Sequence, residues 1–220
     1  RDRSPSRGLG DVYKRQILVF SLAAFYTIYI CIVSDWTQVG GPSRFLTVWG
    51  LFFSLLISWR VLQNSLGQGN NRWDVFVSSS AIVNAMVVFL YWKLFLKDPM
   101  SVTTNGQLDV WWREYYMHLI GPVLMWIDAL FINRVFQKLK KTILWLTTMI
   151  TTYIVWIEFV VRPLNDSPVG KVTNGLPYPF LNDLFLFDRL LFYAVNFIVA
   201  MIFLALFSTI ARIFRSVFVG

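Results

Sequence analysis

The sequence contains little histidine, little cysteine and little charge. Among 220 residues His118 and Cys31 are each the only one of their kind, and 15% of the residues are Asp, Glu, Lys or Arg. A single cysteine cannot form a disulfide within the chain or a cysteine-based metal site. One histidine and two isolated acids within the apolar segments, Asp128 and Glu158, are too few for a normal metal shell or a haem site. The sequence therefore predicts no metal and no cofactor.

The low charge also narrows the class of protein. Soluble domains have about 25% charged residues, well above the 15% found here. The net charge is +8, but no basic stripe with interleaved aromatic residues lies outside the apolar segments, so we predict no nucleic-acid partner. In a chain of this composition the positive charge indicates orientation in a membrane and contact with lipid headgroups.

Apolar residues dominate the chain and lie in long blocks. Hydrophobic residues make up 56% of the sequence, and six blocks approach the ~20 residues that a helix needs to cross ~30 Å of hydrocarbon. The blocks cover residues 17–33, 45–61, 75–96, 115–131, 143–161 and 188–207. None shows the alternation that is typical of membrane β-strands. We predict an all-α, multi-pass integral membrane protein in which residues 17–220 form one six-helix bundle.

The first 16 residues differ from the rest of the chain. Residues 1–16 are polar and basic and resemble translated adaptor sequence, so we expect a leader that is non-native and disordered. Six spans place both termini on one side, together with 13 of the 20 Lys and Arg residues, of which five belong to this leader. The excess favours cytoplasmic termini, and we expect the endoplasmic reticulum or the plasma membrane.

Three side chains at similar depth in the membrane suggest chemistry. By their positions in the predicted spans, Thr47, His118 and Glu158 all lie near the rim opposite the termini. A hydroxyl, an imidazole and a carboxylate are the groups that nucleophilic catalysis requires. A histidine in a membrane helix also serves as an ordinary packed or hydrogen-bonded residue. The residues alone leave both interpretations open.

The helix that carries the histidine has two further unusual residues. Pro122 lacks an N–H and cannot bond to the carbonyl of His118, which leaves that carbonyl free at membrane depth. Asp128 lies ten residues beyond His118, or ~15 Å along a helix. It is therefore too far away to contact the imidazole, and a paired aspartate near the other membrane face is the simpler interpretation.

Three short motifs resemble one known family. They are Arg44-Phe45-Leu46-Thr47 at the start of a span, His118-x-x-x-Pro122, and the GLPYPFL run of residues 175–181. In this order they resemble the family of the androgen-induced protein and the androgen-dependent TFPI-regulating protein. The resemblance implies a membrane threonine hydrolase that cleaves fatty acid esters of hydroxy fatty acids, with Thr47 and His118 as catalytic residues. It also places Asp128 at the family's acidic position.

The implied reaction is acyl transfer in which His118 accepts the proton of Thr47 and the threonine oxygen attacks the ester carbonyl. The expected partners are a lipid ester and the bilayer lipids. From depth alone we expect Glu158 to orient His118. The candidate pocket and oxyanion residues are Asn84, Tyr115, Tyr116, Gly121 and Pro122.

The sequence alone leaves two other functions open. A transporter or channel is one, although the sequence shows no internal repeat of the kind found in many transporters. A non-catalytic lipid-binding protein is the other. A separation of more than ~6 Å between Thr47 and His118 would favour lipid binding, because a base must reach its proton directly or through one water.

Overall fold

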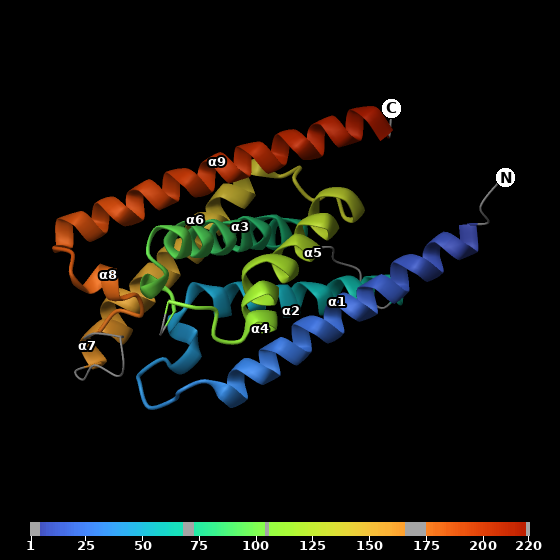
Figure 1. Ribbon diagram of the computed structural model, residues 1–220. Helices are drawn as coiled ribbons and strands as arrows, with labels where there is room; N and C mark the ends of the chain where they lie inside the picture. The colour runs from blue at the N-terminus through green and yellow to red at the C-terminus, as the bar shows by residue number, and fades with distance from the viewer. Residues whose placement is uncertain (1–4, 68–72, 104–105, 166–174, 219–220) are drawn as a thin grey trace.

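The computed structural model describes the backbone of residues 5–67, 73–103, 106–165 and 175–218 (Figure 1). This part of the chain is helical and without strands, and six of its segments are long and apolar enough to cross a membrane, which confirms the predicted fold class. The spans are Val12–Val33, Leu46–Ser65, Asp74–Lys97, Trp111–Ile132, Leu139–Leu164 and Leu186–Val217.

Four spans are single α-helices and two are composite. The single helices are α1 (Pro5–Val33), α2 (Leu46–Ser65), α3 (Asp74–Lys97) and α9 (Leu186–Phe218). The fourth span consists of α4 (Trp111–Tyr115), η3 (Tyr116–Ile120), α5 (Gly121–Ile127) and η4 (Asp128–Ile132). The fifth consists of α6 (Leu139–Val155), η5 (Trp156–Val161) and α7 (Arg162–Leu164). The short elements are η1 (Gly41–Arg44), η2 (Pro99–Ser101) and α8 (Pro179–Asn182).

Helix α3 forms the centre of the bundle (Figure 1). About 67% of its apolar window is buried inside the protein, against 17–39% for the other five spans. Its small residues explain this position, because small side chains let membrane helices approach one another closely. The Ser78 hydroxyl lies 2.9 Å from the Thr142 hydroxyl at the start of α6, and Ser79 donates a hydrogen bond to the Thr142 carbonyl.

The composite spans contain three π-helical stretches, and each holds one histidine or acidic side chain. His118 lies in η3, Asp128 begins η4 and Glu158 lies in η5. A π-helical turn inserts an extra residue into the α-helical ladder, and such turns are frequent at functional sites. Ionisable side chains are costly at membrane depth, so the sequence singles out these three residues. The π-helical geometry singles out the same three.

The first helix extends further back than the sequence predicted. Helix α1 begins at Pro5, so residues 5–16 are helical in the structure, whereas we expected a disordered leader up to residue 16. Two side chains from this stretch contact the bundle. Arg15 pairs with Asp128, and Ser65 at the end of α2 donates a hydrogen bond to Gln16. The expectation that residues 1–16 are non-native stays a prediction.

The bundle has two distinct ends (Figure 1). The start of α1 and the end of α9 lie at the same end of the bundle, which we call the terminal end. The opposite end, which we call the loop end, carries η1, α7, α8 and the start of α9. The fourth span also begins near the loop end, since α4 follows the connection from α3. The candidate residues Thr47, His118 and Glu158 all belong to the loop-end half.

Candidate active site

A tight turn positions Thr47 at the beginning of α2. Gly40 has a φ of 88°, and a Cβ there would lie 2.9 Å from the Arg44 side chain, so glycine is required. The chain then forms η1, becomes extended at Phe45 and enters α2 at Leu46. Two tryptophan indoles, from Trp49 and Trp156, donate hydrogen bonds to the carbonyl of Ser43 and fix the turn.

The Tyr178 hydroxyl completes this turn. It accepts a hydrogen bond of 3.3 Å from the backbone N–H of Leu46, one of the groups that a helix leaves unpaired at its start. Burial raises the pKa of this tyrosine, so its hydroxyl is neutral at physiological pH. Next to it, the Tyr153 hydroxyl donates to the carbonyl of Arg44. Tyrosines from α6 and the α8 loop therefore hold the start of α2.

A π-helical turn positions His118. Pro122 cannot bond to the His118 carbonyl, and the Trp92 indole of α3 donates a hydrogen bond of 2.9 Å to that carbonyl instead. His118 is 7% exposed, and its imidazole stacks on the Tyr91 ring, with 3.5 Å between ring centroids and an interplanar angle of 6°. Helix α3 thus fixes both the backbone and the ring of the histidine.

Thr47 and His118 are in direct contact. The Thr47 Oγ1 lies 3.2 Å from the His118 Nε2. The other ring nitrogen, Nδ1, lies 3.1 Å from the Glu114 carbonyl oxygen and 3.2 Å from the Glu114 Oε2. Because both of these groups are acceptors, Nδ1 carries a proton. In the neutral form of the ring, Nε2 is then an acceptor for the Thr47 hydroxyl.

The carboxylate beside the imidazole is that of Glu114, not Glu158. Glu114 is 9% exposed. Its Oε1 accepts from Arg113 Nε at 3.0 Å and Arg113 Nη2 at 2.7 Å, and its Oε2 accepts from the Tyr91 hydroxyl at 3.0 Å. The side chains from Arg113 to Thr47 therefore form one continuous polar network inside the bundle.

The expectation that Glu158 orients His118 is wrong. Its Oε1 accepts from Arg189 Nε at 2.9 Å and from the Tyr193 hydroxyl at 2.8 Å, and its Oε2 accepts from Arg162 at 3.2 Å. Glu158 and His118 were expected to interact because they lie at similar depth in the membrane. Depth along a helix, however, does not determine which neighbour a side chain faces. Glu158 faces α9, whereas the imidazole lies between α2 and α3.

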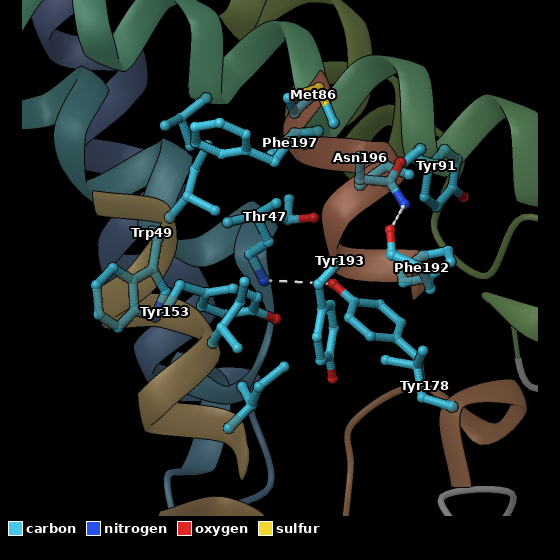
Figure 2. Close-up of a pocket in the computed structure, with 18 of the residues that line it drawn as sticks. Thr47, Trp49, Met86, Tyr91, Tyr153, Tyr178, Phe192, Tyr193, Asn196 and Phe197 are labelled. Carbon is cyan, nitrogen blue, oxygen red and sulfur yellow. Dashed lines mark hydrogen bonds between the residues drawn. The ribbon is translucent and has the colours of Figure 1, made fainter. Parts of the chain in front are cut away.

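An apolar cavity adjoins the threonine (Figure 2). Its volume is about 120 Å³, whereas a single water needs ~10–15 Å³ on the same measure. The walls come from α2, α3, α6, η5, α8 and α9. The lining residues that carry a hydroxyl are Thr47, Tyr91, Tyr153, Tyr178 and Tyr193. His118 does not line the cavity, so a molecule inside meets Thr47 first, with the imidazole behind it.

The far wall of the cavity contains one amide. Asn196 of α9 donates a hydrogen bond of 2.8 Å from its Nδ2 to the carbonyl of Phe192, one turn earlier in the same helix (Figure 2). Phe192 and Phe197 line the cavity on either side of it. Because the amide bonds to its own helix, the surface that α9 presents is mainly aromatic and apolar.

The remaining candidate pocket residues lie away from the cavity. The Asn84 amide donates to the carbonyl of Ser80 at 3.0 Å, within α3. Tyr116 stacks on Tyr26 with 3.6 Å between ring centroids, and Tyr115 is exposed. A Cβ on Gly121 would lie 3.1 Å from the Tyr116 carbonyl, so this glycine serves close packing. None of these side chains, nor Pro122, lines the cavity.

Asp128 belongs to the terminal end, as its distance from His118 predicted. It is 6% exposed and pairs with Arg15 of α1, whose Nη2 also donates to the carbonyl of Leu124. Sequence reasoning expected a paired aspartate but not this partner, because Arg15 was assigned to the leader. The pair links the first and fourth spans.

Sequence reasoning missed several contributors to the site, among them Tyr91, Glu114 and Tyr178. For Glu114 a signal was available. It precedes His118 by four residues, and side chains with that spacing face each other on a helix. Tyr91 and Tyr178 come from a uniformly apolar span and from an irregular loop, where spacing carries no such information.

The structure defines a polytopic helical membrane protein with a buried hydroxyl–imidazole–carboxylate chain beside an apolar cavity. Within the described part of the chain no group of three or more His, Cys, Asp or Glu side chains is placed to hold a metal ion. The sequence matches the FAR-17a/AIG1-like protein family over residues 14–212, and the chain belongs to this family. It is the androgen-induced protein family that the three motifs resemble. None of the curated proteins and none of the solved structures compared with the chain matches it.

Proposed function

We propose that the protein is an intramembrane lipid-ester hydrolase that cleaves fatty acid esters of hydroxy fatty acids. One observation carries the proposal: the Thr47 Oγ1 lies 3.2 Å from an imidazole nitrogen whose partner nitrogen bonds only to acceptors. Threonine is a poor nucleophile unless a base takes its proton. Here His118 Nε2 lies within hydrogen-bond range of the hydroxyl, and the acceptors at Nδ1 favour the tautomer in which Nε2 can take the proton.

The cavity supports a lipid substrate. Its lining is almost wholly apolar, and Thr47 is one of few polar groups at its surface. An ester with two acyl chains can place its carbonyl at the threonine and its chains against the walls from α3, α6 and α9. Water is scarce in such a site, and the charges that develop during acyl transfer therefore interact more strongly with the protein.

The reaction proceeds in two steps. His118 Nε2 takes the proton of Thr47 as Oγ1 attacks the ester carbonyl, and it then returns the proton to the alcohol oxygen of the departing hydroxy fatty acid. The fatty acid remains as an ester on Thr47. In the second step Nε2 takes a proton from water, the hydroxide attacks the acyl carbon, and Thr47 leaves with its proton restored.

The site lies in the loop-end half, opposite both termini. With cytoplasmic termini, the lipid reaches Thr47 from the non-cytoplasmic leaflet of the endoplasmic reticulum or the plasma membrane. The substrate partners of the protein are accordingly bilayer-dissolved esters, and acyl chains approach the cavity laterally.

The test measures both products in one assay. Purified protein in lipid nanodiscs receives an ester of a fatty acid and a hydroxy fatty acid, and mass spectrometry quantifies the two released acids. We expect Thr47→Ala and His118→Gln to release neither product above background, while Thr47→Ser, which keeps the hydroxyl, retains part of the turnover. Full turnover by Thr47→Ala would exclude the threonine as nucleophile. A wild-type protein that binds the ester but releases nothing would instead be a lipid-binding protein.

A further inference from the structure

We infer that Glu114 is the positioning residue of His118 and the counter-ion of the imidazolium that forms during acyl transfer. The inference rests on the proposed function and extends the Thr47–His118 pair to a triad. Glu114 does not touch the cavity, so it acts through the histidine and not on the substrate.

The side chain of Glu114 contributes something that its backbone cannot. The Glu114 carbonyl oxygen already lies 3.1 Å from Nδ1 and is sufficient to select the tautomer. When Nε2 takes the threonine proton, however, the ring becomes a cation inside an apolar bundle. The carboxylate oxygen 3.2 Å from Nδ1 then supplies the opposite charge, and the low polarity of the surroundings strengthens this attraction.

Three neighbours keep this carboxylate ionised and fixed. Arg113 binds Oε1 through two nitrogens, at 3.0 and 2.7 Å, which leaves Oε2 for the Tyr91 hydroxyl and the imidazole. Because each oxygen has its own donor, rotation of the carboxylate would break bonds at both. Hydrogen bonds from charged donors favour the ionised form of a carboxylate. The imidazole therefore has an oriented, charged partner before any substrate binds.

Tyr91 connects this network to the cavity. Its ring stacks on the imidazole and lines the cavity, while its hydroxyl donates to Glu114 Oε2. The stacking fixes the plane of the imidazole, and the hydroxyl fixes the carboxylate. Tyr91→Phe removes the hydroxyl and keeps the ring, so it separates the bond to Glu114 from the stacking on the imidazole.

Glu158 provides a matched control. Like Glu114, it is a largely buried glutamate that binds arginine and tyrosine side chains, and it lies in the same half of the bundle. Its partners are Arg162, Arg189 and Tyr193. It makes no contact with His118. A general loss of buried charge should affect the Glu114 and Glu158 variants alike, whereas a role in catalysis should affect only the former.

The experiment compares kcat and KM for a p-nitrophenyl decanoate probe, using the full chain in nanodiscs. We expect Glu114→Gln to lower kcat about 100-fold with little change in KM. A loss of this size is within the range that a positioned acid–base group contributes to a rate. Glu158→Gln should keep kcat within about twofold in the folded fraction, because it touches neither reacting residue. Glu114→Asp should recover part of the loss, and Tyr91→Phe should lower kcat about tenfold.

Two results would overturn the inference. One is a Glu114→Gln variant that keeps at least half of the wild-type kcat; the other is an equal loss of kcat in the Glu114→Gln and Glu158→Gln variants. If Glu114→Gln does not fold, Tyr91→Phe decides, since it keeps the aromatic ring in place. Thr47→Ala distinguishes a failure of the positioning role of Glu114 from a failure of the proposed hydrolase mechanism. An inactive Thr47→Ala beside a fully active Glu114→Gln removes only the positioning role, whereas an active Thr47→Ala removes the proposed hydrolase mechanism itself.

Discussion

Two buried glutamates in the same half of this bundle have similar neighbours and different consequences. Glu114 and Glu158 each bind arginine and tyrosine, but only Glu114 extends its network to an imidazole and from there to a hydroxyl. The network of Glu158 ends at Arg189, Arg162 and Tyr193. A buried carboxylate with charged partners is therefore not a sign of chemistry by itself. The group at the end of its network decides whether it can assist a reaction.

The largest expected effect comes from the reactive end of the Glu114 network. Thr47→Ala removes the hydroxyl that donates to His118 Nε2, and we expect turnover of a lipid ester to fall by about 10³-fold or more. Labelling by a fluorophosphonate probe, followed on a gel, should disappear in the same variant. Thr47→Ser is the matched control and should retain labelling. Labelling of Thr47→Ala at the wild-type rate would show that another residue is the nucleophile.

The next effect belongs to the Glu158 network and concerns stability. Arg189 is 3% exposed, and Glu158→Gln leaves its buried charge without the carboxylate. Removal of one partner from a buried ion pair costs about 3 kcal/mol. We expect a lower midpoint of thermal unfolding in detergent with unchanged kcat in the folded fraction. An unchanged unfolding midpoint would mean that this pair contributes nothing to the fold.

A substitution in the cavity separates binding from chemistry. Leu90 lines the cavity and is only partly buried, so Leu90→Trp narrows the space with limited strain on the core. We expect KM for a long-chain ester to rise about tenfold, while a short-chain ester is hydrolysed as in the wild type. Leu144→Trp on the exposed face of α6 is the control. Equal effects on both chain lengths would contradict the assignment of this cavity to an acyl chain.

The smallest effect concerns Asp128 at the terminal end. Asp128→Asn weakens the contact with Arg15, and we expect a loss of about 1 kcal/mol in stability with no change in turnover. Arg15→Gln should give the same loss, and the double variant should add little to either, which a double-mutant cycle measures. Strictly additive losses would mean that the two side chains do not interact.

The sequence was sufficient for the fold class and for part of the site. Six apolar blocks predicted six spans because each is long enough to cross the membrane and none alternates like a strand. Thr47 and His118 could be paired because hydrophobic blocks define depth, and the family resemblance supplied their roles. The free carbonyl of His118 also followed from Pro122, and its partner turned out to be Trp92.

The rest of the site could not be predicted because depth does not determine which neighbour a residue faces. Glu158 and Asn84 lie at plausible levels, but Glu158 faces α9, and the Asn84 amide contacts Gly50 of α2 and Met125 of α5. The direction of a side chain in a bundle depends on helix packing, and the π-helical turns at His118 and Glu158 shift it further. Tyr178 comes from an irregular loop, whose path no periodicity describes.

The central claim is that Thr47 carries the acyl group during turnover, and the most direct test is to trap that intermediate. Wild-type protein is mixed with excess fatty acid ester, quenched in acid within the first turnover, digested and analysed by mass spectrometry. We expect that the peptide containing Thr47 gains the mass of the acyl group, that Thr47→Ala shows no such gain, and that Glu114→Gln accumulates the acyl-enzyme more slowly than Glu158→Gln. Ester turnover without acylation of Thr47, or with the acyl group on another residue, would contradict the account.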